Sequence, residues 1–145
     1  IALSAFIPML MGTGGNSGAQ ASTAVIRSLS LGDIEPRDAL RVIWRELRVS
    51  LLCGLSLALV NFVKMLLVDG MLLHNDCVTV AVSATVSLSV LAIVMFAKVV
   101  GSMLPIAAEK LGLDPAVMAN PLISTVTDAV SLLIYIYVAK LILHI

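Results

Sequence analysis

Charged side chains are scarce in this sequence. Lys, Arg, Asp and Glu make up 12% of its 145 residues, whereas a soluble domain carries about 25%. The nine basic and nine acidic side chains leave no net charge, and no basic patch alternates with aromatic residues, which argues against a nucleic-acid partner. Hydrophobic residues make up 60%, and the mean hydropathy is +1.09. This composition excludes an ordinary soluble domain and indicates an integral membrane protein in contact with lipid.

Nitrogen and sulfur ligands for a metal are also few, with two Cys and two His in the chain. Cys53 lies in an apolar run and Cys77 at an expected helix start, and neither has a second ligand at the spacing of a metal site. His74 and His144 stand near expected helix ends without a partner at helical spacing. The sequence therefore predicts inert thiols and disfavours a zinc or copper centre.

Long apolar stretches dominate the chain instead. They cover residues 1–30, 49–68, 77–108 and 115–143, and each offers the roughly 20 residues that a helix needs to span hydrocarbon. The predicted fold class is an all-α helical bundle with four membrane-spanning helices. The chain begins inside the first apolar run, without the basic region of a signal peptide, so we expect a fragment of a longer protein.

Arginines are concentrated at the end of the first apolar stretch and between it and the second. They are Arg27, Arg37, Arg41, Arg45 and Arg48, whereas the connection at 69–77 contains no Lys or Arg. By the positive-inside rule, the first connection and the one at 109–115 are cytoplasmic, and 69–77 is external. The first helix then runs inward. This orientation predicts one more helix upstream and five in the parent chain.

The arginine-rich segment at 33–48 has the pattern of an amphipathic helix. Its apolar residues recur at helical spacing, opposite the arginines; they are Leu40, Ile43, Trp44 and Leu47. We therefore expect a separate helix at the membrane surface, with its arginines facing anionic lipid or a cytoplasmic partner.

The stretch PMLMGTGGNSGAQAST at 8–23 is glycine-rich but is no nucleotide loop, because it lacks the third glycine or the lysine of such loops and follows no strand. Gly14 and Gly18 form a GxxxG pair, typical of closely packed membrane helices. Carboxamides and hydroxyls line up on one face, at Thr13, Asn16, Gln20 and Thr23. Helix packing by small residues and a polar pathway both remain open interpretations of this stretch.

Asp128 is the only carboxylate in the middle of an apolar stretch, and an intramembrane acid indicates function by default because it is costly to place there. At 100° per residue, Ser124, Ser131 and Tyr135 fall within about 60° of it, and Asn120 and Thr127 within about 100°. The opposite side is aliphatic, which predicts a helix that lines an aqueous path. The alternative is a structural ion pair between Asp128 and Lys98.

One carboxylate is too little to hold a dehydrated ion, but a twofold axis would bring two copies of Asp128 together across a narrow pore. Mg²⁺ suits such a site, because it keeps several waters and is met by one or two carboxylates. Calcium needs six to eight direct oxygens. The rival hypotheses are a cation-coupled secondary transporter, a membrane enzyme and a purely structural packing module, of which the enzyme is disfavoured because Asp128 has no catalytic companion.

Three segments carry a resemblance to a known family. They are FIPMLMGTGGNSGAQAST, RDALRVIWRELRVSLLCG and LGLDPAVMANPLISTVTDAVSLLIYIYVAK, starting at residues 6, 37 and 111. Together they resemble the transmembrane domain of the MgtE family of magnesium channels. The resemblance implies a homodimer in a bacterial inner membrane, with the second to fifth of five helices per subunit in this chain. It also implies Mg²⁺ as the transported ion and cytoplasmic CBS-type sensor domains elsewhere in the parent chain.

The resemblance also implies roles for individual residues. Asp128 matches the pore aspartate that holds hydrated magnesium, and Ser124 a position one turn earlier that contributes its backbone carbonyl. Asp114 matches a cytoplasmic acid that shares in gating ions, and Asn120 a residue near the cytoplasmic mouth. The expected metal-binding residues are therefore Asp128, Ser124 and Asp114. The expected pore-lining residues are Gly14, Gly15, Asn16, Gln20, Asn120, Thr127 and Ser131.

Overall fold

Four long helices make up the computed structural model, which describes residues 3–72 and 78–144. They are α1 (Ile7–Ser30), α2 (Ala39–Lys64), α3 (Val80–Lys110) and α4 (Pro115–Leu143). Short 3-10 helices precede α1 and α2, namely η1 (Leu3–Phe6) and η2 (Pro36–Asp38), and the π-helical segment η3 (Met65–Leu72) continues α2. The part of the chain described contains no strand. The prediction of an all-α helical bundle is confirmed.

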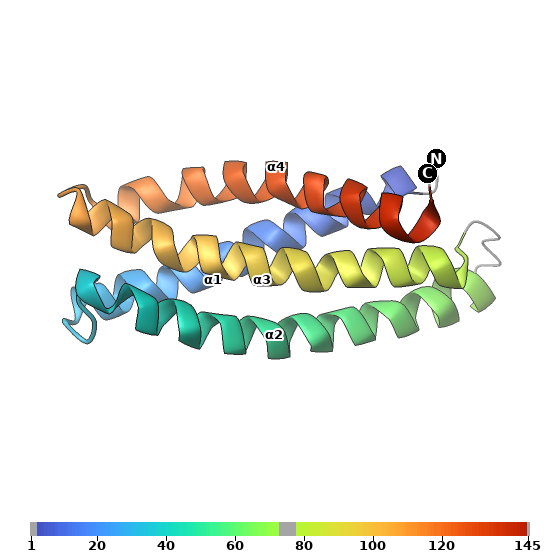
Figure 1. Cartoon of the computed structure of the whole chain (residues 1–145), viewed down its shortest axis with the longest axis horizontal. Coiled ribbons are helices and arrows are strands. Elements are labelled where there is room, and N and C mark those ends of the chain that lie inside the picture. Colours follow the sequence, from blue (N-terminus) through green and yellow to red (C-terminus); the bar gives the residue numbers. More distant parts are fainter. Residues whose placement is uncertain (1–2, 73–77, 145) are drawn as a thin grey trace.

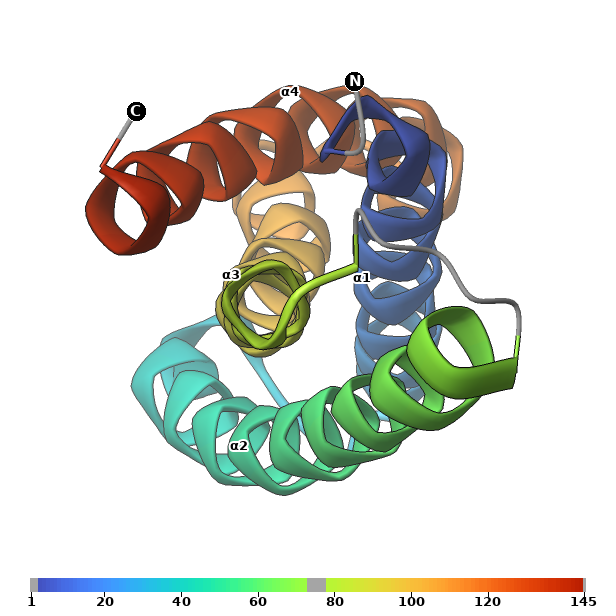
Figure 2. The ribbon, with the colours of Figure 1, turned by 90° about the vertical axis from the view of Figure 1, so that its right-hand side faces the viewer.

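Helix α3 is the centre of the bundle. It packs against α1, α2 and α4, and α1 also packs against α4 (Figures 1 and 2). Several of its buried hydroxyls are satisfied within the helix: Thr85 and Ser89 donate to the carbonyls of Ala81 and Thr85, at 2.8 and 2.7 Å. Because these polar side chains need no outside partner, α3 can be buried on several faces at once.

Three helical stretches within the described residues have the length and apolar composition to cross a bilayer: Pro36–Asp69, Val80–Lys110 and Pro121–Leu143. Helix α1 is not among them, although its 24 residues span about 36 Å at 1.5 Å per residue. It runs alongside the other three helices (Figure 1), and its glycine, hydroxyl and carboxamide residues are what lower its hydropathy. The fourth spanning helix therefore stays a prediction that length and position support.

The segment at 33–48 does not form a helix of its own, so this part of the prediction is wrong, whereas its position at the membrane surface stays a prediction. Helix α2 runs without a break from Ala39 to Lys64, because no glycine or proline occurs between its start and Gly54 and each added residue gains a backbone hydrogen bond. Val42 and Glu46 are buried, whereas Trp44 is 63% exposed and points outward. Residues 39–48 of the amphipathic segment thus form the first turns of a longer helix, α2.

Both short connections lie at the same end of the bundle (Figure 1). Each contains a glycine with positive φ, +74° at Gly32 and +69° at Gly112, where a residue with a Cβ would be strained. The arginines of the first connection and Lys110 therefore share one end, which fits the orientation predicted from charge. His74 and Cys77 lie outside the described residues.

Asp114 begins α4 as its N-cap. Its carboxylate accepts a hydrogen bond of 2.8 Å from the backbone N–H of Ala116, and Pro115 occupies the first helical position. Replacement of Asp114 by Ala is expected to lower the free energy of unfolding by about 1 kcal/mol, because the helix end loses this partner. Asp114→Asn retains a capping oxygen, so its free energy of unfolding is expected to stay within roughly a few tenths of a kcal/mol of the parent's. SDS titration in mixed micelles measures both, and equal losses would contradict the capping role.

Candidate functional site

Glycines bring α1 into close contact with α3 and α4. A Cβ built at Gly14 would lie 2.6 Å from Ser131 Oγ and 2.9 Å from Ile93 Cγ2. At Gly18 it would lie 2.8 Å from Ile123 Cγ2 and 3.2 Å from the carbonyl oxygen of Ala97. These distances leave no room for a side chain, so the GxxxG pair is confirmed as a packing row.

On α3, the matching residue is Gly101, whose Cβ position meets the backbone of Gly18. The two helices therefore touch backbone to backbone at this level. Sequence reasoning singled out Gly18 and missed Gly101. Gly101 could have been found from the sequence as an isolated glycine inside a helical pattern, because such a glycine often marks the close approach of another backbone.

Asp128 lies beside Gly15, on the edge of this contact. The carboxylate is half-buried, and its Oδ1 atom is 3.9 Å from the position of a Cβ at Gly15. Asp128 stands 13 residues after the start of α4 and 15 before its end, which places it about 20 Å from either terminus of the helix. The carboxylate thus lies within a helix long and apolar enough to cross a membrane, against the backbone of Gly15 in α1.

No ion pair within 4 Å involves Asp128 among the residues described. The pairs found there are Arg37–Glu35, Arg45–Glu46 and Lys64–Asp69. Lys98 is buried, but it stands two turns after Leu91, which meets Gly54 of α2, and residues seven apart share a helix face. Lys98 therefore faces α2, whereas Asp128 faces α1. The proposed Asp128–Lys98 pair is absent, and the structural reading of Asp128 that depended on it is wrong.

Polar side chains continue from Asp128 onto the outer surface of the single chain. We define the polar strip as Asn16, Gln20 and Thr23 of α1 with Ser124 and Asp128 of α4. All but the half-buried Asp128 are exposed, and a hollow of about 560 Å³ follows the α1 part. The carboxamides of Asn16 and Gln20 have no hydrogen-bond partner in the described part of the chain. A membrane helix that shows unpaired amides on its outside needs water or a partner there.

Other predicted site residues lie elsewhere in the single chain. Thr127 is buried and donates to the carbonyls of Ile123 and Ser124, at 2.6 and 3.2 Å. Ser131 is buried beside Gly14. The structure thus places Thr127 and Ser131 in the contact between helices, away from the polar strip, and their role as pore-lining residues stays a prediction.

The predicted cytoplasmic acids are also apart from Asp128. Asp114 stands 14 residues earlier at the start of α4, about 21 Å away along the helix axis. Asn120 lies within α4, and its side chain is outside what the structure describes. Among the residues described, no group of three or more His, Cys, Asp and Glu gathers in one place. Among the residues described, one copy of the chain therefore supplies a single carboxylate within the middle part of α4.

Comparisons with known proteins agree with these features. The sequence model of a family described as "MgtE: Divalent cation transporter" matches residues 7–138. The protein named "Magnesium transporter MgtE" in Thermus thermophilus is 43% identical over 143 residues, which is 99% of this chain and 30% of that relative. Proteins of the same name in Bacillus subtilis and Enterococcus faecalis are each 32% identical, over 99% and 96% of the chain and 30% and 29% of the relative. The chain thus spans about 30% of the length of these relatives.

Proposed function

The chain belongs to the MgtE family of divalent cation transporters, and from this premise we propose that it forms the membrane pore through which its parent protein conducts Mg²⁺ down the electrochemical gradient. The observation that carries the proposal is the Asp128 carboxylate. It lies mid-helix, half-buried, without an ion-pair partner among the described residues, and against the backbone of Gly15. A charge in this position is stabilised when a cation binds it.

Two copies of the chain complete the site. A homodimer with its twofold axis beside the polar strip brings two Asp128 carboxylates to one ion. The same arrangement encloses Asn16 and Gln20, whose amides then meet water in the pore in place of lipid. A hydrated Mg²⁺ ion is large enough to reach both carboxylates through its own waters. The dimer, and the cytoplasmic sensor domains that would control it, are parts of this proposal.

Each element of the strip has a physical role in the proposed pore. Asp128 supplies charge, and Ser124, one turn nearer the cytoplasmic end, supplies oxygen atoms for the ion's hydration shell. Gly15 leaves the space beside the carboxylate open for water, because it has no side chain. Mg²⁺ dehydrates reluctantly, so a pore that keeps this space open offers a lower barrier than one that strips the ion.

Replacement of Gly15 by Val tests whether the room for water beside the Asp128 carboxylate is needed for conduction. The methyl groups of the valine side chain would displace water from the Asp128 carboxylate. Because an unsatisfied polar group costs about 1–3 kcal/mol, Mg²⁺ uptake is expected to fall roughly 5- to 100-fold. Stability is expected to change little, because only the Asp128 Oδ1 atom lies within 4 Å of the new Cβ. Uptake into proteoliposomes and the unfolding midpoint separate the two effects. Unchanged uptake in a folded variant would contradict the proposed water space.

Flux in the absence of a counter-ion gradient distinguishes a channel from a coupled transporter. The parent protein is reconstituted in liposomes that contain a Mg²⁺-sensitive dye, and a potassium diffusion potential is applied with valinomycin. An interior potential of −100 mV favours entry of a divalent cation by about 4.6 kcal/mol, twice the value for a single charge. We expect uptake that rises with this potential at equal pH and equal Na⁺ on both sides. Uptake that requires a proton or sodium gradient would support the coupled transporter.

A further inference from the structure

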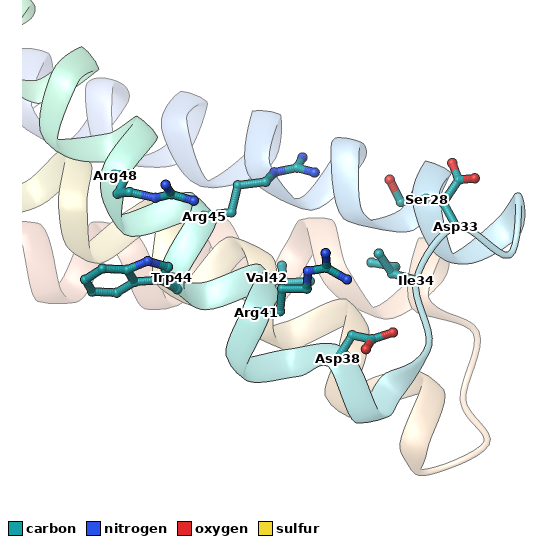
Figure 3. Close-up of a pocket in the computed structure, with 9 residues that line it drawn as sticks. All are labelled: Ser28, Asp33, Ile34, Asp38, Arg41, Val42, Trp44, Arg45 and Arg48. Carbon is teal, nitrogen blue, oxygen red and sulfur yellow. The ribbon is translucent and has the colours of Figure 1, made fainter.

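A second polar region lies far from Asp128, where α1 gives way to α2. It is a hollow of about 600 Å³, and Figure 3 shows three arginines around it, Arg41, Arg45 and Arg48, all from the first half of α2. The turn after α1 closes the other side with Asp33. The hollow belongs to the outer side of the bundle, since α2 packs on α3 and leaves Trp44 exposed. We call it the arginine pocket.

The positive charges of the arginine pocket are incompletely balanced. Among the described residues, Arg41 and Arg48 have no carboxylate within 4 Å, and Arg45 has one contact of 3.7 Å with Glu46. The carboxylate of Asp38, at the edge of the pocket, already accepts the backbone N–H of Glu35 at 2.9 Å. Two guanidinium groups are therefore open to an anion. Their planar fork of donors fits the oxygens of a phosphate group.

The surroundings of the pocket indicate where such a phosphate comes from. Trp44 is exposed beside it, with the Arg48 guanidinium 6.0 Å from the ring centroid, and tryptophan is typical of the boundary between lipid headgroups and hydrocarbon. Further along the same face, α2 exposes a row of aliphatic side chains at Leu52, Leu55 and Leu59. A continuous apolar surface thus leads away from the pocket for the length of about two helical turns.

We propose that the arginine pocket binds the phosphate headgroup of an anionic phospholipid, whose acyl chains lie along the aliphatic row of α2. An acidic protein partner would also satisfy the arginines, but it would not use the apolar row that adjoins them. Anionic lipids are enriched in the cytoplasmic leaflet, which is the side predicted for this end of the bundle. The inference concerns α2 alone and does not depend on the ion that passes Asp128.

Quenching of Trp44 fluorescence by brominated lipids tests the proposal. The parent protein is reconstituted with brominated phosphatidylglycerol or brominated phosphatidylcholine, and the Trp44→Phe variant provides the signal to subtract for other tryptophans. Phosphatidylglycerol is expected to occupy the site in preference to phosphatidylcholine. Each arginine near an anionic surface contributes about 1 kcal/mol, which is about fivefold in relative affinity. The double variant Arg41→Gln/Arg48→Gln is therefore expected to lose about 25-fold of the preference.

Two further variants separate the site from a general charge effect. Arg37→Gln removes an exposed arginine of the same segment that is paired with Glu35 at 2.9 Å and lies outside the pocket, and it is expected to keep the preference. Arg41→Lys/Arg48→Lys keeps both charges and is expected to keep most of it, which also shows that the fold tolerates changes at these positions. An equal loss in Arg37→Gln, or equal quenching by both lipids in the parent, would overturn the proposal.

Competition separates lipid from other anions. Inorganic phosphate or glycerol phosphate at millimolar concentration is expected to leave the quenching unchanged, because neither has acyl chains to lie on α2. Displacement of phosphatidylglycerol by inorganic phosphate would overturn the lipid assignment in favour of a soluble anion. Displacement of phosphatidylglycerol by an acidic peptide, added at the same concentration of negative charges, would overturn the lipid assignment in favour of a protein partner.

Discussion

Replacement of Asp128 by Asn is expected to reduce Mg²⁺ uptake by roughly 10- to 100-fold. The carboxamide keeps the shape of the side chain but removes the negative charge, and a hydrogen bond to a charged group contributes about 1.5–3 kcal/mol. In the proposed dimer both carboxylates are lost at once, so selectivity for divalent over monovalent cations is expected to fall as well. Asp128 makes no ion pair among the described residues, so the substitution leaves no buried cation behind and the variant is expected to fold. Initial rates of dye-reported uptake into proteoliposomes measure the effect.

Asp69→Asn is the matched control for this experiment. It removes a carboxylate of the same charge, which pairs with Lys64 at 2.7 Å in the segment that continues α2. Its uptake is expected to equal that of the parent. A normal rate and normal selectivity in Asp128→Asn would remove the carboxylate from the mechanism and favour a domain whose membrane glycines serve packing alone.

The second large effect is expected at Gly101, where even a methyl group has no room. A Cβ there meets the carbonyl of Gly18 and lies 2.8 and 2.9 Å from its C and Cα atoms. Because these are backbone atoms, only a shift of the whole of α1 away from α3 relieves the clash. We expect Gly101→Ala to lower the free energy of unfolding by roughly 3 kcal/mol or more, at the upper end of the cost of overpacking. The gain of about 1 kcal/mol from the higher helix propensity of Ala is too small to offset it.

Gly12→Ala provides the comparison. No atom lies within 4 Å of a Cβ at Gly12, so this substitution brings the helix propensity of Ala without a clash. It is expected to be neutral or to stabilise by up to about 1 kcal/mol. SDS titration of both variants in mixed micelles measures the difference. Similar stabilities for Gly101→Ala and Gly12→Ala would contradict the backbone contact between α1 and α3.

Periodicity along the chain predicted a close helix contact of α1 but did not identify the neighbours of the polar side chains of α4. The GxxxG pair in α1 was recognisable because only very small residues allow such close contact between membrane helices. The angles of Thr127 and Ser131 around α4 predicted that both line a path, but an angle does not say which neighbour covers a side chain. In the single chain that neighbour is α1, and both side chains are buried. Residues that lie about 60–100° around α4 from Asp128 can line a path or pack against another helix. The angle alone does not distinguish the two environments.

Sequence alone determined that this is a membrane protein of α-helices, that its arginines gather near one connection, and that a single carboxylate occurs in the middle of an apolar stretch. These conclusions depend on composition and spacing along the chain, which the transfer of charge and backbone into lipid constrains directly. Tertiary structure decided that Gly101 meets Gly18, that no ion pair joins Lys98 to Asp128, and that Asn16 and Gln20 lie on the outside of one copy. Hydropathy does not say whether a side chain faces lipid or another helix, because lipid and a packed helix are equally apolar.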